Sequence, residues 1–297
     1  MKLYDSIGPN PRIVRMFMAE KGIEMPKQTV DLRGGENRQD AHLKRNPHGQ
    51  MPTLELDDGS YLSEITAICE YLEEKQPSPA MIGSTPEQRA ECRMWTRRVD
   101  LNIAEPLANG YRYGEAAKFF EKRIPVAPEA SPGLKMVAAN RLQWLNGQMA
   151  DGREYLCGNR FTLADILLYC WIEFGNQVGQ PLDPANTHIT IWFARVGQRP
   201  SVKVLARASP SPAAPWGWVK ERVFADLIFI QLTPTSSPGL PPSLKLRRAQ
   251  DRKPVEASRP AEVRLRTKAV GVDGTGRSSI PETAVLARES RRTGCPA

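Results

Sequence analysis

The residue pattern changes once along the chain, near residue 80, and this change limits the available folds more than any other feature. Before it, strand-like and helix-like segments alternate. We expect strands at 2–4, 29–31, 51–56 and 61–62, and helices at 10–21, 37–45 and 64–74. Pro11 suits the first turn of the first helix, because its missing N–H has no partner there. The first 75 residues therefore predict a βαβ unit followed by αββα, which is a small mixed sheet with helices.

From Pro86 onward the pattern is helical only. It predicts one long helix over 87–112, bent near Pro106, and further helices over 133–150, from Phe161 onward and over 188–198. Thr162 and Asp165 have the spacing of a capping box, with Asp in place of Glu. The apolar run 166–174 that follows indicates a central helix. Two tryptophans of this region are predicted to lie in the core, Trp95 and Trp144.

Helical periodicity stops just past Pro200. Residues 208–297 are rich in Pro, Ser, Arg and Ala without a sustained period, so we expect a basic, largely disordered tail. The formal net charge is +8, but residues 1–207 hold 26 Lys and Arg against 25 Asp and Glu. The charge thus belongs to the tail, and the nearly neutral remainder argues against a nucleic-acid partner.

The cysteine pattern argues against a metal centre or a disulfide framework. No CxxC pair occurs, and the five cysteines are widely spaced: Cys69, Cys92, Cys157, Cys170 and Cys295. The chain opens on Met1-Lys2-Leu3-Tyr4 without the apolar segment of a signal peptide, and its longest apolar run is too short to span a bilayer. We therefore expect a cytoplasmic protein without a membrane partner.

Resemblance to a known family rests on three stretches: MKLYDSIGPNPRIVRMFMAEKGIE, NPHGQMPTLELDDGSYLSEITAICEYLEE and YLCGNRFTLADILL. Their order, spacing and residue types resemble the cytosolic glutathione transferases, in particular bacterial-type, theta-, beta- or nu-like members. The resemblance covers about residues 1–205. It implies an α/β thioredoxin-like N-terminal domain over 1–76 and an all-α C-terminal domain over 86–205, with the tail over 208–297 outside both.

The resemblance also implies a glutathione site. Pro52 stands where the family has a cis-proline, which exposes the backbone of Met51 to pair with the cysteinyl part of glutathione. Glu64 would take the γ-glutamyl ammonium, although Ile65 replaces the hydroxyl residue that usually follows, leaving only its N–H. Gln50 stands where a Lys often reaches the glycyl carboxylate. Ordinary structural roles, such as a strand start or a solvated loop, are the alternatives for each.

The residue that activates the thiol is less clearly marked. The family places Tyr, Ser or Cys near the end of the first strand; here the Ser-type alignment falls near Gly8, and Asn10 occupies the Cys-type position. An Asn amide can donate to a thiolate but cannot act as a base. Ser6 is the other candidate and lies early in the loop, and Arg12 adds positive potential or is merely solvated.

An acceptor pocket is expected between the domains, lined by residues of the first long helix. The candidates are Asn102, Tyr111, Arg112 and Tyr113, with packing between helices as the alternative. The resemblance implies a homodimeric transferase that conjugates the glutathione thiolate to small electrophiles, as in detoxification, with no cofactor or metal beyond glutathione as substrate. A glutathione-dependent reductase, peroxidase or isomerase, or a non-catalytic glutathione-binding protein, are the alternatives on the same scaffold.

Overall fold

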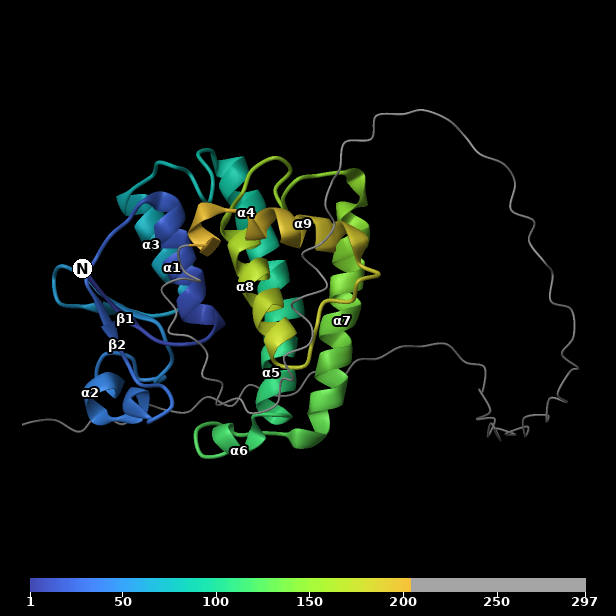
Figure 1. The fold of residues 1–297 in the computed structure, drawn as a ribbon. Coiled ribbons are helices and arrows are strands. Elements are labelled where there is room, and N and C mark those ends of the chain that lie inside the picture. The colour runs from blue at the N-terminus through green and yellow to red at the C-terminus, as the bar shows by residue number, and fades with distance from the viewer. Residues whose placement is uncertain (204–297) are drawn as a thin grey trace, which may run out of the picture. The chain divides into compact units, whose positions relative to one another are not determined.

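The structure, a computed structural model, describes residues 1–203. The tail expected over 208–297 lies outside the described residues. The first part of the chain contains four strands and three α-helices, in the expected order (Figure 1). These are β1 (Lys2–Asp5), α1 (Pro9–Lys21), β2 (Lys27–Thr29), α2 (Asp40–Leu43), β3 (Thr53–Glu55), β4 (Tyr61–Leu62) and α3 (Ile65–Lys75).

The four strands form one mixed sheet in the order β2-β1-β3-β4. β1 is parallel to β2, and β3 is antiparallel to both β1 and β4. Leu3 of β1 pairs with Leu54 of β3, and both side chains are completely buried. β2 begins two residues before the expected strand, although the N–H of Val30 still donates to the Asp5 carbonyl at 2.8 Å, so the pairing continues beyond the strand.

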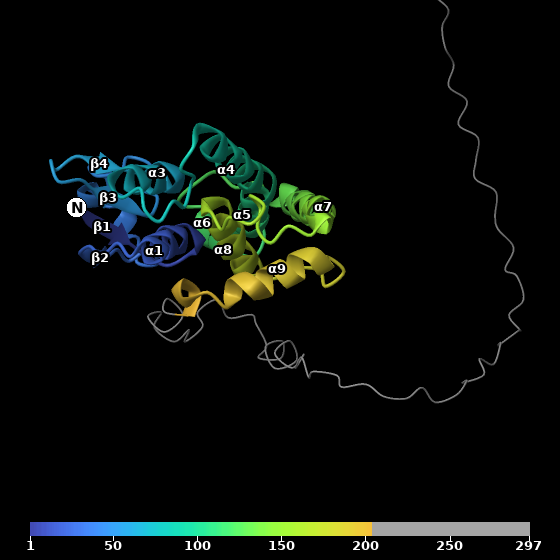
Figure 2. The same cartoon turned by 90° about the horizontal axis from the view of Figure 1, so that it is seen from above.

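The second part is helical: α4 (Pro86–Val99), α5 (Glu105–Tyr113), α6 (Ala117–Phe120), α7 (Ser131–Gln148), α8 (Leu163–Gln177) and α9 (Thr187–Gly197). Helices α1 and α3 lie between the sheet and these helices (Figure 2), and α1 packs directly on α8. One apolar cluster runs from Leu3 of the sheet to Trp192 of α9, so both parts share a core. Within residues 1–203 no helix is long and apolar enough to cross a membrane.

The long helix expected over 87–112 is interrupted. Residues Asp100–Ala104 form a π-helical turn between α4 and α5, in which the N–H of Glu105 donates to the carbonyl of Asp100. Pro106 follows directly; it has no N–H, and its ring would crowd the Asn102 carbonyl in a regular α-helix. The distortion therefore lies just before the proline. Such π-turns are frequent at functional sites.

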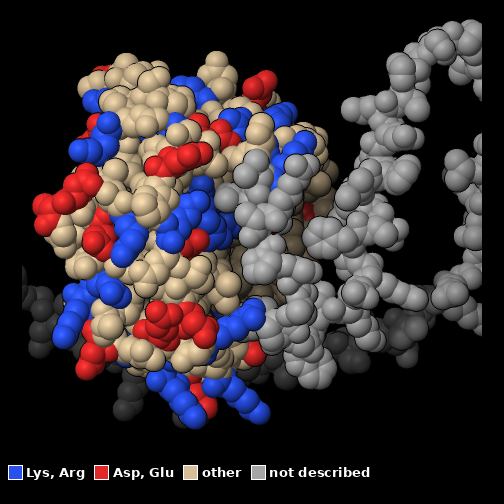
Figure 3. Space-filling view, turned by 60° about the vertical axis from the view of Figure 1, so that its left-hand side comes forward, with Lys and Arg blue, Asp and Glu red and all other residues tan. Residues whose placement is uncertain are grey.

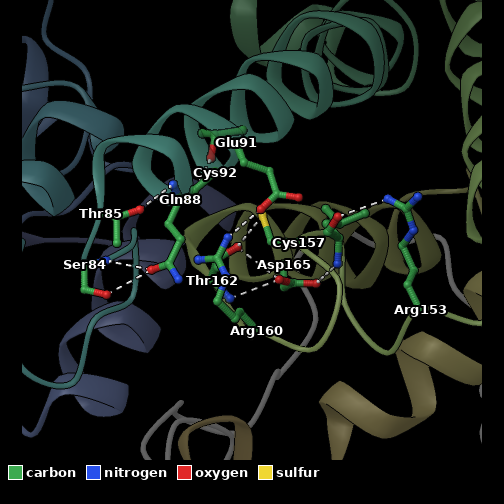
Figure 4. Close-up of polar contacts among 12 residues, drawn as sticks. Ser84, Thr85, Gln88, Glu91, Cys92, Arg153, Cys157, Arg160, Thr162 and Asp165 are labelled. Atoms are coloured by element: carbon green, nitrogen blue, oxygen red, sulfur yellow. Dashed lines mark hydrogen bonds and ion pairs between the residues drawn. The ribbon is translucent and has the colours of Figure 1, made fainter.

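The start of α8 confirms the predicted capping box (Figure 4). The Asp165 carboxylate is fully buried and accepts hydrogen bonds from the N–H of Thr162 at 3.0 Å, the N–H of Leu156 at 2.9 Å and the indole N–H of Trp192 at 2.9 Å. Burial raises the pKa of Asp165 to about 6, although these donors favour its charged form. This one side chain thus joins α8, the preceding loop and α9.

The expectation that Trp144 lies in the core is wrong, whereas Trp95 is buried as predicted. Trp144 is 40% exposed. Helix α7 directs Ala138, Leu142 and Leu145 inward at helical spacing, and Trp144 lies about 100° around the helix from Leu145. Its ring lies 6.4 Å from that of Trp95, so it covers the edge of the core rather than filling it.

Candidate active site

The loop between β1 and α1 places Asn10 and Ser6 in different environments. Gly8 has φ 104° and ends the loop, so α1 starts at Pro9 with no acidic residue in its first turn. Asn10 is half-buried in that turn, and its carboxamide makes no hydrogen bond within residues 1–203. Ser6 is buried, and its hydroxyl donates to the Val30 carbonyl at 2.7 Å. Of these two candidates, Asn10 is the one whose side-chain donor is available to a ligand.

Two arginines of α1 hold this loop and helix in place. Arg15 Nη1 donates to Asp5 Oδ1 and to the Ser6 carbonyl at 2.9 Å. Arg12, for which solvent exposure was one interpretation, instead forms an ion pair with Glu173 of α8, with Nη2 to Oε1 at 2.9 Å. Burial raises the pKa of Glu173, and the Arg12 guanidinium opposes that shift. The pair fixes the start of α1 against the helical part.

The loop 46–52 is fixed by two buried asparagines. Asn46 Nδ2 donates to the Gln50 carbonyl at 3.0 Å, and Asn37 Nδ2 donates to the Gly49 carbonyl at 2.6 Å. Gly49 has φ 59°, and a Cβ there would lie 2.9 Å from the Asn37 carbonyl oxygen, so only glycine fits without a shift. The loop has one conformation set by these contacts.

At the end of this loop the Met51–Pro52 peptide bond is cis, as the resemblance implies. The Met51 side chain is buried against Tyr4 and Val30. Its backbone N–H and C=O form no hydrogen bond within residues 1–203, because β3 begins only at Thr53. An extended peptide could therefore pair with Met51 as an added strand. The Gln50 side chain is exposed beside it.

Glu64 has the most unusual backbone of the described residues. It is the one non-glycine residue among them with positive φ, at 69°. It precedes Ile65, where α3 begins, and its side chain is exposed. Non-glycine residues in such conformations cost about 1–3 kcal/mol and are concentrated at functional sites. Glu64 and the unpaired N–H groups at the start of α3 together present a carboxylate beside hydrogen-bond donors.

Asp100 is a further acidic group that the sequence did not mark. Burial raises the pKa of Asp100, the carboxylates of Glu105 and Glu64 raise it further, and Arg97 opposes them. Asp100 thus lies within electrostatic reach of Glu64, although 36 residues separate them in the chain. An ion pair joins α4 to α3 in this region, in which Arg93 Nη2 donates to Glu70 Oε2 at 2.8 Å. No local sequence signal indicates this proximity.

The residues predicted for the acceptor pocket are not gathered at one place. Asn102 lies in the π-turn and donates to the Arg98 carbonyl at 2.9 Å. Tyr111 and Arg112 lie at the other end of α5, about 14 Å away along the helix axis at 1.5 Å per residue. Tyr111 is buried with its ring 5.2 Å from that of Phe174, and Arg112 Nη1 donates to Asn109 Oδ1 at 3.1 Å. Tyr113 is half-buried at the end of the same helix.

A mixed β2-β1-β3-β4 sheet with a cis-proline loop, packed through α1 on an all-helical part, is the thioredoxin-like arrangement of glutathione-binding enzymes. Comparisons with known proteins agree. Residues 7–75 match the family model "Glutathione S-transferase, N-terminal domain", and residues 111–200 match "Glutathione S-transferase, C-terminal domain". The chain belongs to the glutathione S-transferase family and is an enzyme of that family.

Three relatives illustrate the similarity. The chain is 43% identical over 178 residues to a maleylacetoacetate isomerase of Pseudomonas aeruginosa, covering 57% of this chain and 78% of that protein. It is 29% identical over 208 residues to Glutathione S-transferase 2 of Saccharomyces cerevisiae, covering 69% of this chain and 89% of that protein. A crystal structure of a glutathione S-transferase domain-containing protein from Marinobacter aquaeolei superposes with a TM-score of 0.64 at 32% identity, covering 68% of this chain and all of that one.

Proposed function

We propose that this enzyme binds glutathione along Met51 and the start of α3, and that its thiolate attacks small electrophiles. The proposal is carried by the free carboxamide of Asn10 in the first turn of α1, taken together with the unpaired backbone of Met51 in the cis-proline loop. Family membership supports glutathione as the substrate. No cofactor beyond glutathione enters this proposal.

In the proposed complex the cysteinyl part of glutathione pairs with the Met51 N–H and C=O. Glu64 takes the γ-glutamyl ammonium, supported by the nearby negative charge of Asp100, and the Ile65 N–H takes the γ-glutamyl carboxylate. Gln50 hydrogen-bonds the glycyl carboxylate without adding charge. Pro52 sets the course of the chain between Met51 and β3. The tripeptide is thus held at both ends, with its thiol directed at α1.

The chemistry depends on lowering the pKa of the bound thiol. The thiolate is the nucleophile, and hydrogen bonds and positive potential favour it over the thiol. Asn10 would donate one such bond, and the uncompensated positive end of α1 would add potential. Ser6, whose proton is already donated to Val30, would not. The electrophile would then react because both partners are held together.

A glutathione-dependent isomerase is the second candidate, because a relative at 43% identity is a maleylacetoacetate isomerase. In that reaction the thiolate adds to a double bond, the bond rotates, and the thiolate leaves again, so glutathione is not consumed. The same site would serve either reaction. We also propose that residues 1–76 and 86–205 act as two domains of one subunit and that the enzyme is cytoplasmic. We further propose that it is a homodimer, and light scattering at micromolar concentration can test this oligomeric state.

The test combines binding and turnover. The purified protein is passed over immobilised glutathione. The bound fraction is assayed with glutathione and an aryl chloride, and separately with glutathione and a cis-configured unsaturated diacid. We expect retention and chloride release that is first order in enzyme. Isomerisation without glutathione consumption would favour the second candidate, and failure to bind glutathione would contradict both.

A further inference from the structure

A basic cavity of about 440 Å³ lies where the loop before α2 meets the segment around α6. Its charged lining residues are Arg33, Arg38, Lys118, Glu121, Lys122 and Arg123. Five cations against one carboxylate give the lining a formal charge of +4. Basic side chains project from the lower edge of the molecule in Figure 3, the level at which α2 and α6 lie in Figure 1. A cavity with this charge would attract an anion.

Two arginines of the lining, Arg123 and Arg38, donate hydrogen bonds to backbone carbonyls. Arg123 donates to the carbonyls of Leu32 at 2.8 Å and Arg33 at 3.2 Å, and its guanidinium stacks 3.8 Å from the Phe119 ring centroid. Arg38 Nη1 donates to the His48 carbonyl at 3.2 Å, and its Nε is buried without a partner. Carbonyl oxygens position a guanidinium but do not neutralise it, so both keep their positive charge.

The carboxylates near this cavity are largely engaged in the loop itself. Asp31 Oδ1 accepts the N–H groups of Arg33 and Gly34, both at 2.9 Å, and Glu36 Oε2 accepts the N–H of Asp31 at 2.7 Å. Burial lowers the pKa of Arg123, the charge of Arg38 lowers it further, and Asp31 opposes them. Burial is the largest cause of this pKa shift, and the opposing effect of Asp31 is smaller than the effect of Arg38.

The cavity adjoins the end of α5, where two of the residues predicted for the acceptor pocket lie. Tyr111 is within electrostatic reach of Arg33: burial and Glu115 raise the pKa of Tyr111, whereas Arg33 lowers it. The Arg112 guanidinium lies 5.9 Å from the Phe120 ring, beside the cavity-lining Phe119. Aromatic rings and cations thus occur together, which suits an acceptor with an apolar body and an acidic group.

We infer that this cavity binds the carboxylate of the acceptor substrate, so that the enzyme prefers aromatic or unsaturated organic acids to neutral electrophiles. Arg38 and Arg123 each keep N–H groups beyond those that donate to backbone carbonyls, which could donate to a carboxylate, and Lys118 and Lys122 add point charges at the rim. The inference rests on the proposed function, since it assigns the acceptor of that reaction.

The kinetic test compares 4-chloro-3-nitrobenzoate with the corresponding neutral carboxamide, using the full chain. In both, the glutathione sulfur forms a bond to the ring carbon, the carbon–chlorine bond breaks, and chloride leaves with the electron pair. In Lys118→Gln/Lys122→Gln we expect kcat/KM for the benzoate to fall roughly three- to tenfold, since exposed charge pairs contribute modestly. The kcat/KM for the carboxamide should stay unchanged. Lys75→Gln on α3 is the matched control, and it should leave kcat/KM for both acceptors unchanged. An equal fall for both acceptors would overturn the inference.

A binding test separates the cavity from the reaction. Phthalate and its neutral dimethyl ester are titrated calorimetrically into the full chain, with and without saturating glutathione. We expect phthalate to bind and its dimethyl ester not to bind. Phthalate should bind more weakly in the double variant and at higher salt, and it should still bind when glutathione is present. Displacement by glutathione would assign the cavity to the glycyl carboxylate and overturn the inference. If phthalate binds the wild type and not the double variant while the wild type conjugates neither acceptor, that result would support an anion site but contradict the proposed function.

Discussion

Glu64 carries a structural cost that the proposed role in binding glutathione would explain. Its φ of 69° is unfavourable for any side chain with a Cβ, yet the chain holds it there at the start of α3. A residue chosen for stability alone would be glycine. The position of the carboxylate beside the N–H groups of α3 and near Asp100 offers a reason for keeping glutamate.

Replacing Glu64 by Gly and by Ala separates these effects. Both variants lose the carboxylate, so both should bind glutathione more weakly, by roughly tenfold or more for one hydrogen bond to a charged group. Glu64→Gly reaches the observed backbone without strain and should be more stable than Glu64→Ala by about 1 kcal/mol. Calorimetric binding and urea unfolding measure the two effects. Equal stabilities would show that the backbone relaxes when the side chain is changed.

At the scale of elements, the start of α8 depends on Asp165. Its carboxylate faces only donors, so Asp165→Asn would point an amide NH₂ at other N–H groups. We expect this variant to lose about 2–4 kcal/mol of unfolding free energy, because buried donors lose their acceptor. Glu129→Gln, an exposed carboxylate before α7, is the control and should change little. Chemical denaturation of the three proteins gives the answer.

The same residue predicts a pH dependence. The pKa of Asp165 is about 6 when folded, above its ordinary value of 3.8, so the folded state binds this proton more tightly than the unfolded state. The contribution of this group to stability is therefore full below about pH 4 and is lost as the pH rises through 6. The difference in unfolding free energy between wild type and Asp165→Asn should therefore narrow as the pH rises from about 4 to above 6. A difference that widens instead would mean that the donors, not burial, dominate the titration.

At the scale of the whole molecule, ion pairs connect the first 75 residues to the helices. Arg12 pairs with Glu173, and Arg199 donates to both oxygens of Glu20 at 2.7 Å. These contacts fix α1, and hence Asn10, relative to the part that would hold the acceptor. In the proposed reaction, the relative placement of glutathione and the acceptor would thus depend on the packing of α1 against the helices rather than on one loop.

A double-mutant cycle on Arg12→Ala and Glu173→Ala measures this connection. We expect a coupling free energy of about 1–3 kcal/mol, because the pair is largely buried. The Arg93–Glu70 pair also joins the two parts with the same chemistry but is more exposed, so its coupling should be below about 1 kcal/mol. Unfolding free energies of the single and double variants give both values. Similar couplings would show that burial does not strengthen the first pair.

Local sequence signals predicted much of this molecule. The order of strands and helices and the Thr162–Asp165 box depend on residues close together in the chain, and the structure confirms them. The cis bond before Pro52 was implied by the family resemblance, and the structure confirms it as well. Features that depend on distant packing were missed. Arg12 and Glu173 are 161 residues apart, and Trp144 lies on an outer face of α7 that periodicity did not identify. The bend near Pro106 was predicted, but not its form as a π-turn. The assignments of Asn10, Met51 and Glu64 to glutathione stay predictions.

The ultraviolet absorbance of the bound thiolate against pH tests the central claim most directly. If Asn10 donates to the thiolate, Asn10→Ala should raise the pKa of bound glutathione by roughly one to two pH units, from about 1.5–3 kcal/mol for the lost bond. Conjugation at neutral pH should fall roughly ten- to a hundredfold where thiolate supply limits the rate. Ser6→Ala, whose hydroxyl faces Val30, should leave the titration unchanged. A titration that shifts in Ser6→Ala and not in Asn10→Ala would contradict the account.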